Sequence, residues 1–187
     1  GNLFPREAIL RIVEAAPGLV VVDEAYYAFS GGATLLHDVR RYPNLMLVRT
    51  VSKLGLAGLR LGVAIGARDW LDELEKLRLP YNVNALSMAA AELLLDHRDV
   101  LEAQKLAIGA GRSRLESGLD RIAGLKRFPS AANFVLAEFE DAEAALIRAR
   151  EAHLLVRDAR RYPGLGRALR ITIGTAEQNG RLLEAWQ

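Results

Sequence analysis

Short apolar runs that stop abruptly at polar residues constrain the fold of this chain more than any other feature. The run over residues 19–22 ends at Asp23 and Glu24, and the run over residues 45–48 is followed by a polar stretch at 49–53. Runs of this length are typical of strands buried on both faces of a sheet. Because stretches with helical spacing separate them, the sequence predicts an α/β fold with a parallel or mixed sheet. In such folds the chemistry lies at the carboxyl ends of the strands.

The remaining elements follow from periodicity and from Pro and Gly signals. Asp69 is the expected N-cap of a helix that Pro80 ends. Four apolar residues spaced seven apart, from Leu94 to Leu115, predict one face of a long helix that bends near residues 109–111. We predict helices over residues 5–16, 35–41, 70–79 and 142–152 and from 176 onward, strands over 60–65, 133–138, 154–156 and 169–173, and a loop over 157–166.

Composition excludes several classes of protein. The 187 residues are 51% hydrophobic and 26% charged, as in a water-soluble globular chain. Lys+Arg 25 and Asp+Glu 23 are interspersed, so no nucleic-acid partner is expected. The absence of cysteine removes disulfides, thiolate zinc sites and cysteine nucleophiles, and the three histidines lack metal-ligand spacing, so no metal is expected. No apolar run reaches the ~18 residues of a membrane helix and no signal peptide is evident, so we expect a cytoplasmic protein.

Chemistry-bearing residues gather in two segments. The first is VVVDEAYY, which contains Asp23 and Tyr26; the second is VSKLGLAGLR, which contains Lys53. Asp23 and Lys53 each follow a predicted strand and could converge above one sheet, whereas the simpler alternative is a turn-capping Asp and a solvated Lys. Ser52 and Arg60 supply a hydroxyl and a guanidinium suited to a phosphate.

A lysine amine, an acid, a tyrosine and a phosphate cradle match what pyridoxal phosphate requires. A phosphate-loop ATPase is disfavoured, because Lys53 precedes the glycines of its segment and the order G-x-x-x-x-G-K-[ST] is absent. A nicotinamide site is disfavoured as well, because no G-x-G-x-x-G follows the first strand. Tyr27 is expected to be a packing aromatic.

The motifs VVVDEAYYAFS, YPNLMLVRTVSKLGLAGLRLG, PYNVN, SAANFVL, LLVRD and LRITIGTAEQN resemble the carboxyl-terminal half of the histidinol-phosphate aminotransferase family. The resemblance implies fold type I of the pyridoxal-phosphate-dependent transferases, with an incomplete large domain and an α+β small domain. It divides the chain into residues 1–79 from the large domain, a connecting long helix at 80–118 and a small domain at 119–187.

The same resemblance implies a role for each candidate residue. Lys53 would form the Schiff base with the cofactor and move a proton between substrate and cofactor, and Asp23 would pair with the pyridine nitrogen. Tyr26 would hydrogen-bond the phenolic oxygen of the ring. Ser52 and Arg60 would hold the cofactor phosphate.

Two further arginines would bind substrate. Arg170 would clamp the carboxylate of glutamate, the amino donor, and Arg157 would bind the phosphate of histidinol phosphate; both could instead be partners in structural ion pairs. The expected substrates are histidinol phosphate and glutamate or 2-oxoglutarate, in histidine biosynthesis, and the expected assembly is a homodimer.

Several alternatives stay open. A threonine-phosphate decarboxylase or an aromatic aminotransferase shares much of the pattern. Family members are about twice as long, and their glycine turn would end at Gly1. The chain could therefore be an inactive fragment that serves as an association module. A regulator built on the same fold is a third hypothesis, which would require a fused winged-helix domain.

Overall fold

The computed structural model describes residues 1–187, which divide into two compact units. The first unit comprises Phe4–Ala103, and the second comprises Gly1–Leu3 together with Gln104–Gln187. No helix in the structure is both long and apolar enough to cross a membrane. The expected division at residues 1–79, 80–118 and 119–187 stays a prediction.

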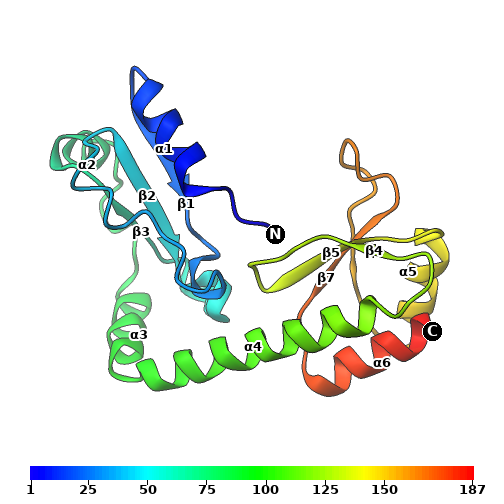
Figure 1. Ribbon diagram of the computed structural model, residues 1–187. Helices are drawn as coiled ribbons and strands as arrows, with labels where there is room; N and C mark the ends of the chain where they lie inside the picture. Colours follow the sequence, from blue (N-terminus) through cyan, green and yellow to red (C-terminus); the bar gives the residue numbers. More distant parts are fainter. The chain divides into compact units, whose positions relative to one another are not determined.

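The first unit is built on a mixed three-stranded sheet of order β1-β2-β3. Strand β1 pairs with β2 in parallel, with Val20 opposite Leu45 and Asp23 opposite Val48, and β3 joins β2 in antiparallel. Figure 1 shows α1 alongside β1 and β2. The elements are α1 (Arg6–Ala15), β1 (Val20–Asp23), η1 (Tyr27–Phe29), β2 (Leu45–Thr50), η2 (Ser52–Leu54), η3 (Ala57–Leu59), β3 (Gly62–Ile65), α2 (Arg68–Glu75) and α3 (Ala85–Asp96).

The core of this unit lies between α1 and the sheet. Leu10 and Val13 of α1 pack against Leu45 and Leu47 of β2, and Leu35 completes the cluster. The apolar runs therefore form the predicted strands, and the mixed sheet is confirmed.

Several local expectations in the first unit are wrong. The helix expected over residues 70–79 ends at Glu75, before Pro80 is reached. Residues 35–41 form successive turns instead of a helix, in which Asp38 N–H donates to Leu35 O and Asp38 O accepts from Tyr42 N–H. The buried Asp38 carboxylate pairs with Arg6, so a tertiary contact organises this segment. Asp69 lies within the first turn of α2, and Ala67 is the N-cap without a side-chain hydrogen bond.

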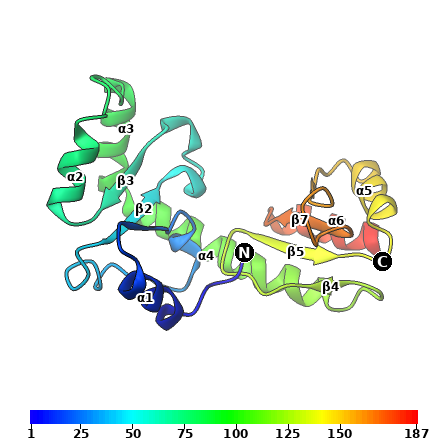
Figure 2. The same ribbon diagram turned by 90° about the horizontal axis from the view of Figure 1, so that it is seen from above.

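The second unit is an antiparallel sheet of order β4-β5-β7-β6 with helices on one face. Val135 and Ala137 of β5 and Leu169 and Ile171 of β7 point into the core. Figure 2 shows β5 and β7 with α5 and α6 beside them. The elements are α4 (Arg98–Leu119), whose residues 98–103 belong to the first unit, β4 (Lys126–Arg127), β5 (Phe134–Glu138), α5 (Ala142–Glu151), β6 (Arg157–Asp158), β7 (Ala168–Thr172) and α6 (Ala176–Trp186).

The expected long helix is interrupted at a different place. The break falls at His97 (φ −108°, ψ 40°), between α3 and α4, and α4 runs without interruption through Gly109 and Gly111. A glycine lowers helix stability by about 1 kcal/mol without ending the helix. Leu94 therefore belongs to α3, whereas the other three positions of the seven-residue series belong to α4.

The predicted strand over residues 154–156 is also displaced. Strand β6 covers Arg157–Asp158, which the sequence assigned to a loop, and residues 154–156 carry no strand. The apolar side chains of Leu154 and Val156 pack against the core without entering the sheet. The short strand β4 has no apolar run and was not predicted.

Candidate active site

Lys53 lies in a turn directly after β2. Strand β2 ends at Thr50, Lys53 is the central residue of η2, and Gly55 ends that turn in the left-handed conformation (φ 86°). The Lys53 Nζ atom lies 5.2 Å from the centroid of the Tyr26 ring. The structure thus brings two predicted site residues together from the ends of β1 and β2, and both are half-buried.

Asp23 is the last residue of β1 and is exposed. Its Oδ1 atom accepts a hydrogen bond of 2.8 Å from the Ala25 N–H, which holds the carboxylate over the following turn. Asp23 therefore caps the following turn, as the simpler alternative predicted. A capped carboxylate still keeps acceptor capacity on its second oxygen.

The predicted phosphate-binding residues lie at the two ends of the η2–η3 segment: Ser52 begins η2 and Arg60 follows η3. Ser52 Oγ lies 2.8 Å from Thr50 Oγ1, which also accepts from the Ser52 N–H at 3.0 Å. Thr50 is thus a neighbouring hydroxyl that the sequence analysis missed; its place at the end of a strand, two residues before Ser52, was the available signal.

Arg60 does not begin a strand as expected. It adopts a left-handed conformation (φ 52°) at the end of η3, two residues before β3, and is exposed. Its Nη1 atom makes a long hydrogen bond of 3.4 Å to Ala57 O. A non-glycine residue in this conformation is uncommon and marks a position that deserves a functional hypothesis.

Arg157 and Arg170 lie directly opposite each other in the second unit. They are register partners on the antiparallel strands β6 and β7, and Leu136 on β5 is the other neighbour of Arg170. Opposite residues in such a pair have Cβ atoms roughly 4.5–5.5 Å apart and point to the same face. That face is opposite to the one formed by Leu169 and Ile171, which the helices cover.

Arg170 carries an unsatisfied donor. Its Nε atom is buried without a hydrogen-bond partner, and its guanidinium lies 5.0 Å from the centroid of the Phe134 ring. Buried donors are nearly always paired in folded proteins, so an unpaired guanidinium N–H beside a second arginine is suited to an anion. Phe134 was not singled out from the sequence.

The loop after β6 adds to this positive region. The pKa of Tyr162 is lowered by hydrogen bonds from Arg161 and then from Arg157. The guanidinium of Arg160 holds the pKa of Asp158 at about 2. Arginines therefore dominate the electrostatics next to Arg157.

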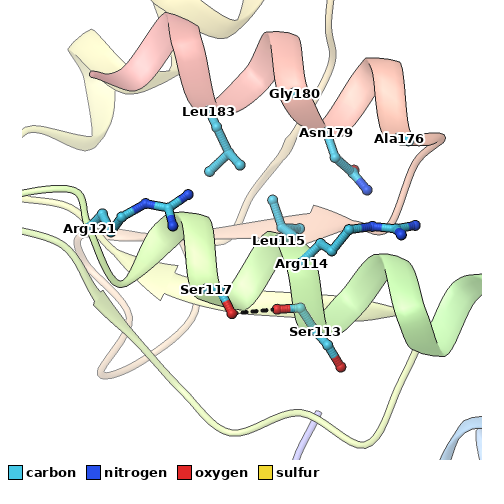
Figure 3. A pocket seen from close by; sticks show the side chains of 9 residues that line it. All are labelled: Ser113, Arg114, Leu115, Ser117, Arg121, Ala176, Asn179, Gly180 and Leu183. Atoms are coloured by element: carbon cyan, nitrogen blue, oxygen red, sulfur yellow. Dashed lines mark hydrogen bonds between the residues drawn. The ribbon is translucent and has the colours of Figure 1, made fainter.

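A separate cavity of about 490 Å³ lies between α4 and α6. Figure 3 shows Arg114 from α4 and Arg121 from the turn after it beside Asn179 and Leu183 from α6. None of the predicted site residues lines this cavity. It lies where α4 and α6 meet, whereas Arg157 and Arg170 are on the strands.

Comparison with known proteins shows which family the chain belongs to. The family described as aminotransferase class I and II matches residues 1–185. Histidinol-phosphate aminotransferase 2 of Nitrosococcus oceani is 42% identical over 188 aligned positions, which cover 99% of this chain and 52% of the relative. The protein of the same name from Bordetella bronchiseptica is 43% identical over 191 positions, covering 100% and 52%. The chain thus spans about half the length of these relatives.

Solved structures share the fold. The histidinol-phosphate aminotransferase of Sinorhizobium meliloti in complex with pyridoxal-5'-phosphate superposes with a TM-score of 0.86 at 28% identity, covering 100% of this chain and 53% of that one. L-threonine-O-3-phosphate decarboxylase from Porphyromonas gingivalis gives 0.85 at 28% identity, covering 99% and 59%. The predicted fold class, fold type I with an α/β part, is confirmed.

Proposed function

Because this chain belongs to the aminotransferase class I and II family, we propose that it forms part of a pyridoxal-phosphate enzyme acting on histidinol phosphate and 2-oxoglutarate. The names of its relatives at 42–43% identity support this choice of reaction. A homodimer in the cytoplasm is part of the same proposal.

The residues of the first unit fit pyridoxal phosphate. Lys53 offers an amine that would attach the cofactor, and Asp23 offers a carboxylate that would hold a proton at the pyridine nitrogen. Tyr26, whose ring lies beside Lys53 Nζ, would donate a hydrogen bond to the phenolic oxygen of the cofactor. Ser52 and Arg60 offer the hydroxyl and guanidinium that would bind the phosphate. When bound, the cofactor supplies an aldehyde and a ring that withdraws electrons from the substrate carbon.

The chemistry of this chain's own residues is proton transfer and anion binding. Lys53 Nζ would remove the proton from the substrate Cα and return it to the adjoining carbon of the cofactor. An amine held against an aromatic ring has restricted motion, which keeps such a base in reach of the proton.

The observation that carries the choice of substrate is the pair of arginines on β6 and β7. Arg170, with its buried and unpartnered Nε, would bind the carboxylate of glutamate or 2-oxoglutarate, and Arg157, directly opposite, would bind the phosphate of histidinol phosphate. Two adjacent guanidinium groups would let one site accept the carboxylate of glutamate and the phosphate of histidinol phosphate in turn, since histidinol phosphate itself carries no carboxylate.

The test is a panel of amino donors with the natural full-length protein. We expect a visible absorption band on addition of pyridoxal phosphate and turnover of histidinol phosphate, and we expect Lys53→Ala to lose both. Arg157→Gln should raise KM for histidinol phosphate about 10- to 100-fold, since a charged hydrogen bond contributes about 1.5–3 kcal/mol, and leave KM for glutamate unchanged. A Lys53→Ala protein with full turnover would contradict the proposal.

A second candidate is a threonine-phosphate decarboxylase, which the structural match to the Porphyromonas gingivalis enzyme favours. That substrate carries both a carboxylate and a phosphate, so the Arg157–Arg170 pair does not by itself distinguish the two. Release of carbon dioxide from threonine phosphate, without amino transfer to 2-oxoglutarate, would select this candidate.

The alternative from another class is an inactive association module. Addition of pyridoxal phosphate to the 187-residue chain distinguishes it: a stable visible band with transaminase activity would exclude this alternative, and its absence alongside an active longer protein would support it.

A further inference from the structure

A buried ion pair connects the ends of β1 and β2 behind the Lys53 site. The Glu24 Oε2 atom accepts hydrogen bonds from Arg49 Nε at 2.9 Å and from Arg49 Nη2 at 2.8 Å. The Glu24 Oε1 atom accepts from the Leu35 N–H at 2.8 Å, and the Thr34 hydroxyl lies 2.9 Å from both carboxylate oxygens. Arg49 Nη2 also donates to Thr34 Oγ1 at 2.7 Å. We call these four residues and Tyr27 the Glu24–Arg49 clasp.

Two consecutive tyrosines each contact one cation. The guanidinium carbon of Arg49 lies 3.9 Å from the centroid of the Tyr27 ring, and Lys53 Nζ lies 5.2 Å from that of Tyr26. Tyr27 is thus more than the packing aromatic that the sequence indicated. The segment that follows β1 thus contacts Arg49 through Tyr27 and Lys53 through Tyr26.

The clasp and the candidate site use different side chains of the segment that follows β1. Glu24 comes directly after the last residue of β1 and its N–H still donates to Val48 O, so the extended chain directs its side chain to the face opposite to Asp23. A cavity of about 230 Å³ lies on the Glu24 side, lined by Tyr27, Arg49 and Leu54 among other residues. Asp23, Tyr26 and Lys53 do not line it.

The pair is too buried to be a surface salt bridge. Only 8% of the Glu24 side chain and 20% of the Arg49 side chain are exposed. Removing both charges from water carries a desolvation penalty, which the pair offsets only through its many hydrogen bonds. Two hydrophobic side chains could fill the same space without this penalty. The ion pair therefore contributes a defined geometry rather than extra stability.

We propose that Arg49 is a positioning residue that acts through Glu24 and Tyr27 to hold Asp23 and Tyr26 in register with Lys53. Glu24 is the neighbour of Asp23, Tyr27 is the neighbour of Tyr26, and Arg49 precedes Lys53 by four residues on the strand that leads to it. The planar guanidinium can donate from two nitrogens, here both to Glu24 Oε2, and stack on a ring at the same time, which a lysine ammonium cannot do. The inference rests on the proposed function and adds residues that do not touch the substrate or the cofactor.

The test compares matched variants of the natural full-length protein. Arg49→Lys keeps the charge and loses the forked, stacked geometry. Tyr27→Phe keeps the ring that Arg49 contacts, and Tyr27→Leu removes it. Arg68→Lys is the control, since Arg68 forms an exposed ion pair with Asp72 in α2 of the same unit.

The first readout needs no cofactor. Lys53 is labelled with an amine reagent in cofactor-free protein, and its extent of labelling is measured by mass spectrometry. A cation over an aromatic ring gains about 0.5–1 kcal/mol at a partly exposed site. If Tyr26 moves away, labelling of Lys53 should become about 3-fold faster in Arg49→Lys and Tyr27→Leu and stay unchanged in Tyr27→Phe and Arg68→Lys.

The second readout uses the loaded protein. We expect Arg49→Lys and Tyr27→Leu to shift the pH midpoint of the visible band and to lower kcat about 10-fold with little change in KM, because the reacting groups are misplaced while substrate binding is not. Tyr27→Phe keeps the ring that Arg49 contacts, so its pH midpoint and kcat should equal those of the wild type.

The outcomes separate this inference from the proposed function. If the wild type forms no visible band, the proposed function fails, and the Lys53 labelling rates alone then decide whether the clasp positions Tyr26. If the variants melt at a lower temperature but keep the labelling rate, the pH midpoint and kcat of the wild type, the clasp only stabilises the fold and the inference is overturned.

Discussion

At the scale of single residues, paired charges control the loop that follows β6. Arg160 donates from Nη2 to Asp158 Oδ2 at 2.8 Å and forms a second ion pair of 2.7 Å with Glu143 on α5. The backbone N–H of Arg160 also donates to Asp158 Oδ1 at 2.9 Å. These contacts fix the chain one residue after Arg157, and so they support the position of that arginine on β6.

Replacing Arg160 tests this arrangement. The pKa of Asp158 is lowered from 3.8 to about 2, first by the side chain of Arg160 and then by its backbone N–H. In Arg160→Gln we expect the pKa of Asp158 to rise toward its ordinary value, measured by NMR titration of the carboxyl carbon. Arg167→Gln, in the same loop, is the control and should leave the Asp158 titration where it is.

The same shift predicts a pH dependence of stability. Because the folded-state pKa of Asp158 lies below its unfolded value, the ion pair stabilises the protein above pH 3.8. That contribution is lost as the pH falls through about 2. Between these limits the melting temperature of the wild type should fall more steeply than that of Arg160→Gln; parallel melting curves would argue against a folded-state ion pair.

At the scale of elements, two glycines of α4 have different roles. A Cβ atom built on Gly118 would lie 2.3 Å from Leu183 Cδ1 on α6, whereas one built on Gly109 would meet nothing within 4 Å. Gly118 therefore permits α6 to approach α4, and Gly109 lies where an alanine fits. This contact explains why a glycine is present at position 118, near the end of α4.

Paired alanine substitutions distinguish these roles. Gly118→Ala should lower the free energy of unfolding by about 1–3 kcal/mol through overpacking. Gly109→Ala should raise it by roughly 0.5–1 kcal/mol, because alanine favours the helix and reduces the entropy of the unfolded chain. Urea denaturation measures both; equal effects of the two substitutions would show that α6 does not pack closely on α4.

At the scale of the whole molecule, the two units bury their apolar side chains to different extents. The second unit has a continuous core formed by β5, β7 and three helices. In the first unit, Val21 and Val63 of the sheet are each 53% exposed, and Leu77 and Leu86 are 80% and 83% exposed. A surface with many exposed large apolar side chains is typical of an interface that another polypeptide segment covers.

Hydrogen exchange of the 187-residue chain should reveal this difference. Amides of β5 and β7 lie in the complete core and should be the most protected, whereas those of β3 should exchange through local opening at much lower free energy. Mass spectrometry with and without low urea measures both sets. Equal protection of β3 and β5 at every urea concentration would contradict the difference between the two units.

The local part of the fold and of the site follows from the sequence. Apolar runs predict β1 and β2, helical spacing predicts α1, α5 and α6, and the residues at the strand ends single out Asp23 and Lys53. Each of these features depends only on residues that are close together along the chain, so a short stretch of sequence is enough to predict it.

Only the tertiary structure decided which distant residues meet. It set the register that places Arg157 opposite Arg170, the stacking of Arg49 on Tyr27 and the left-handed conformation of Arg60. The sequence predicted neither the displaced strand β6 nor the break at His97. Pairing between strands and packing between helices depend on contacts across long stretches of chain, and these contacts override weak local preferences.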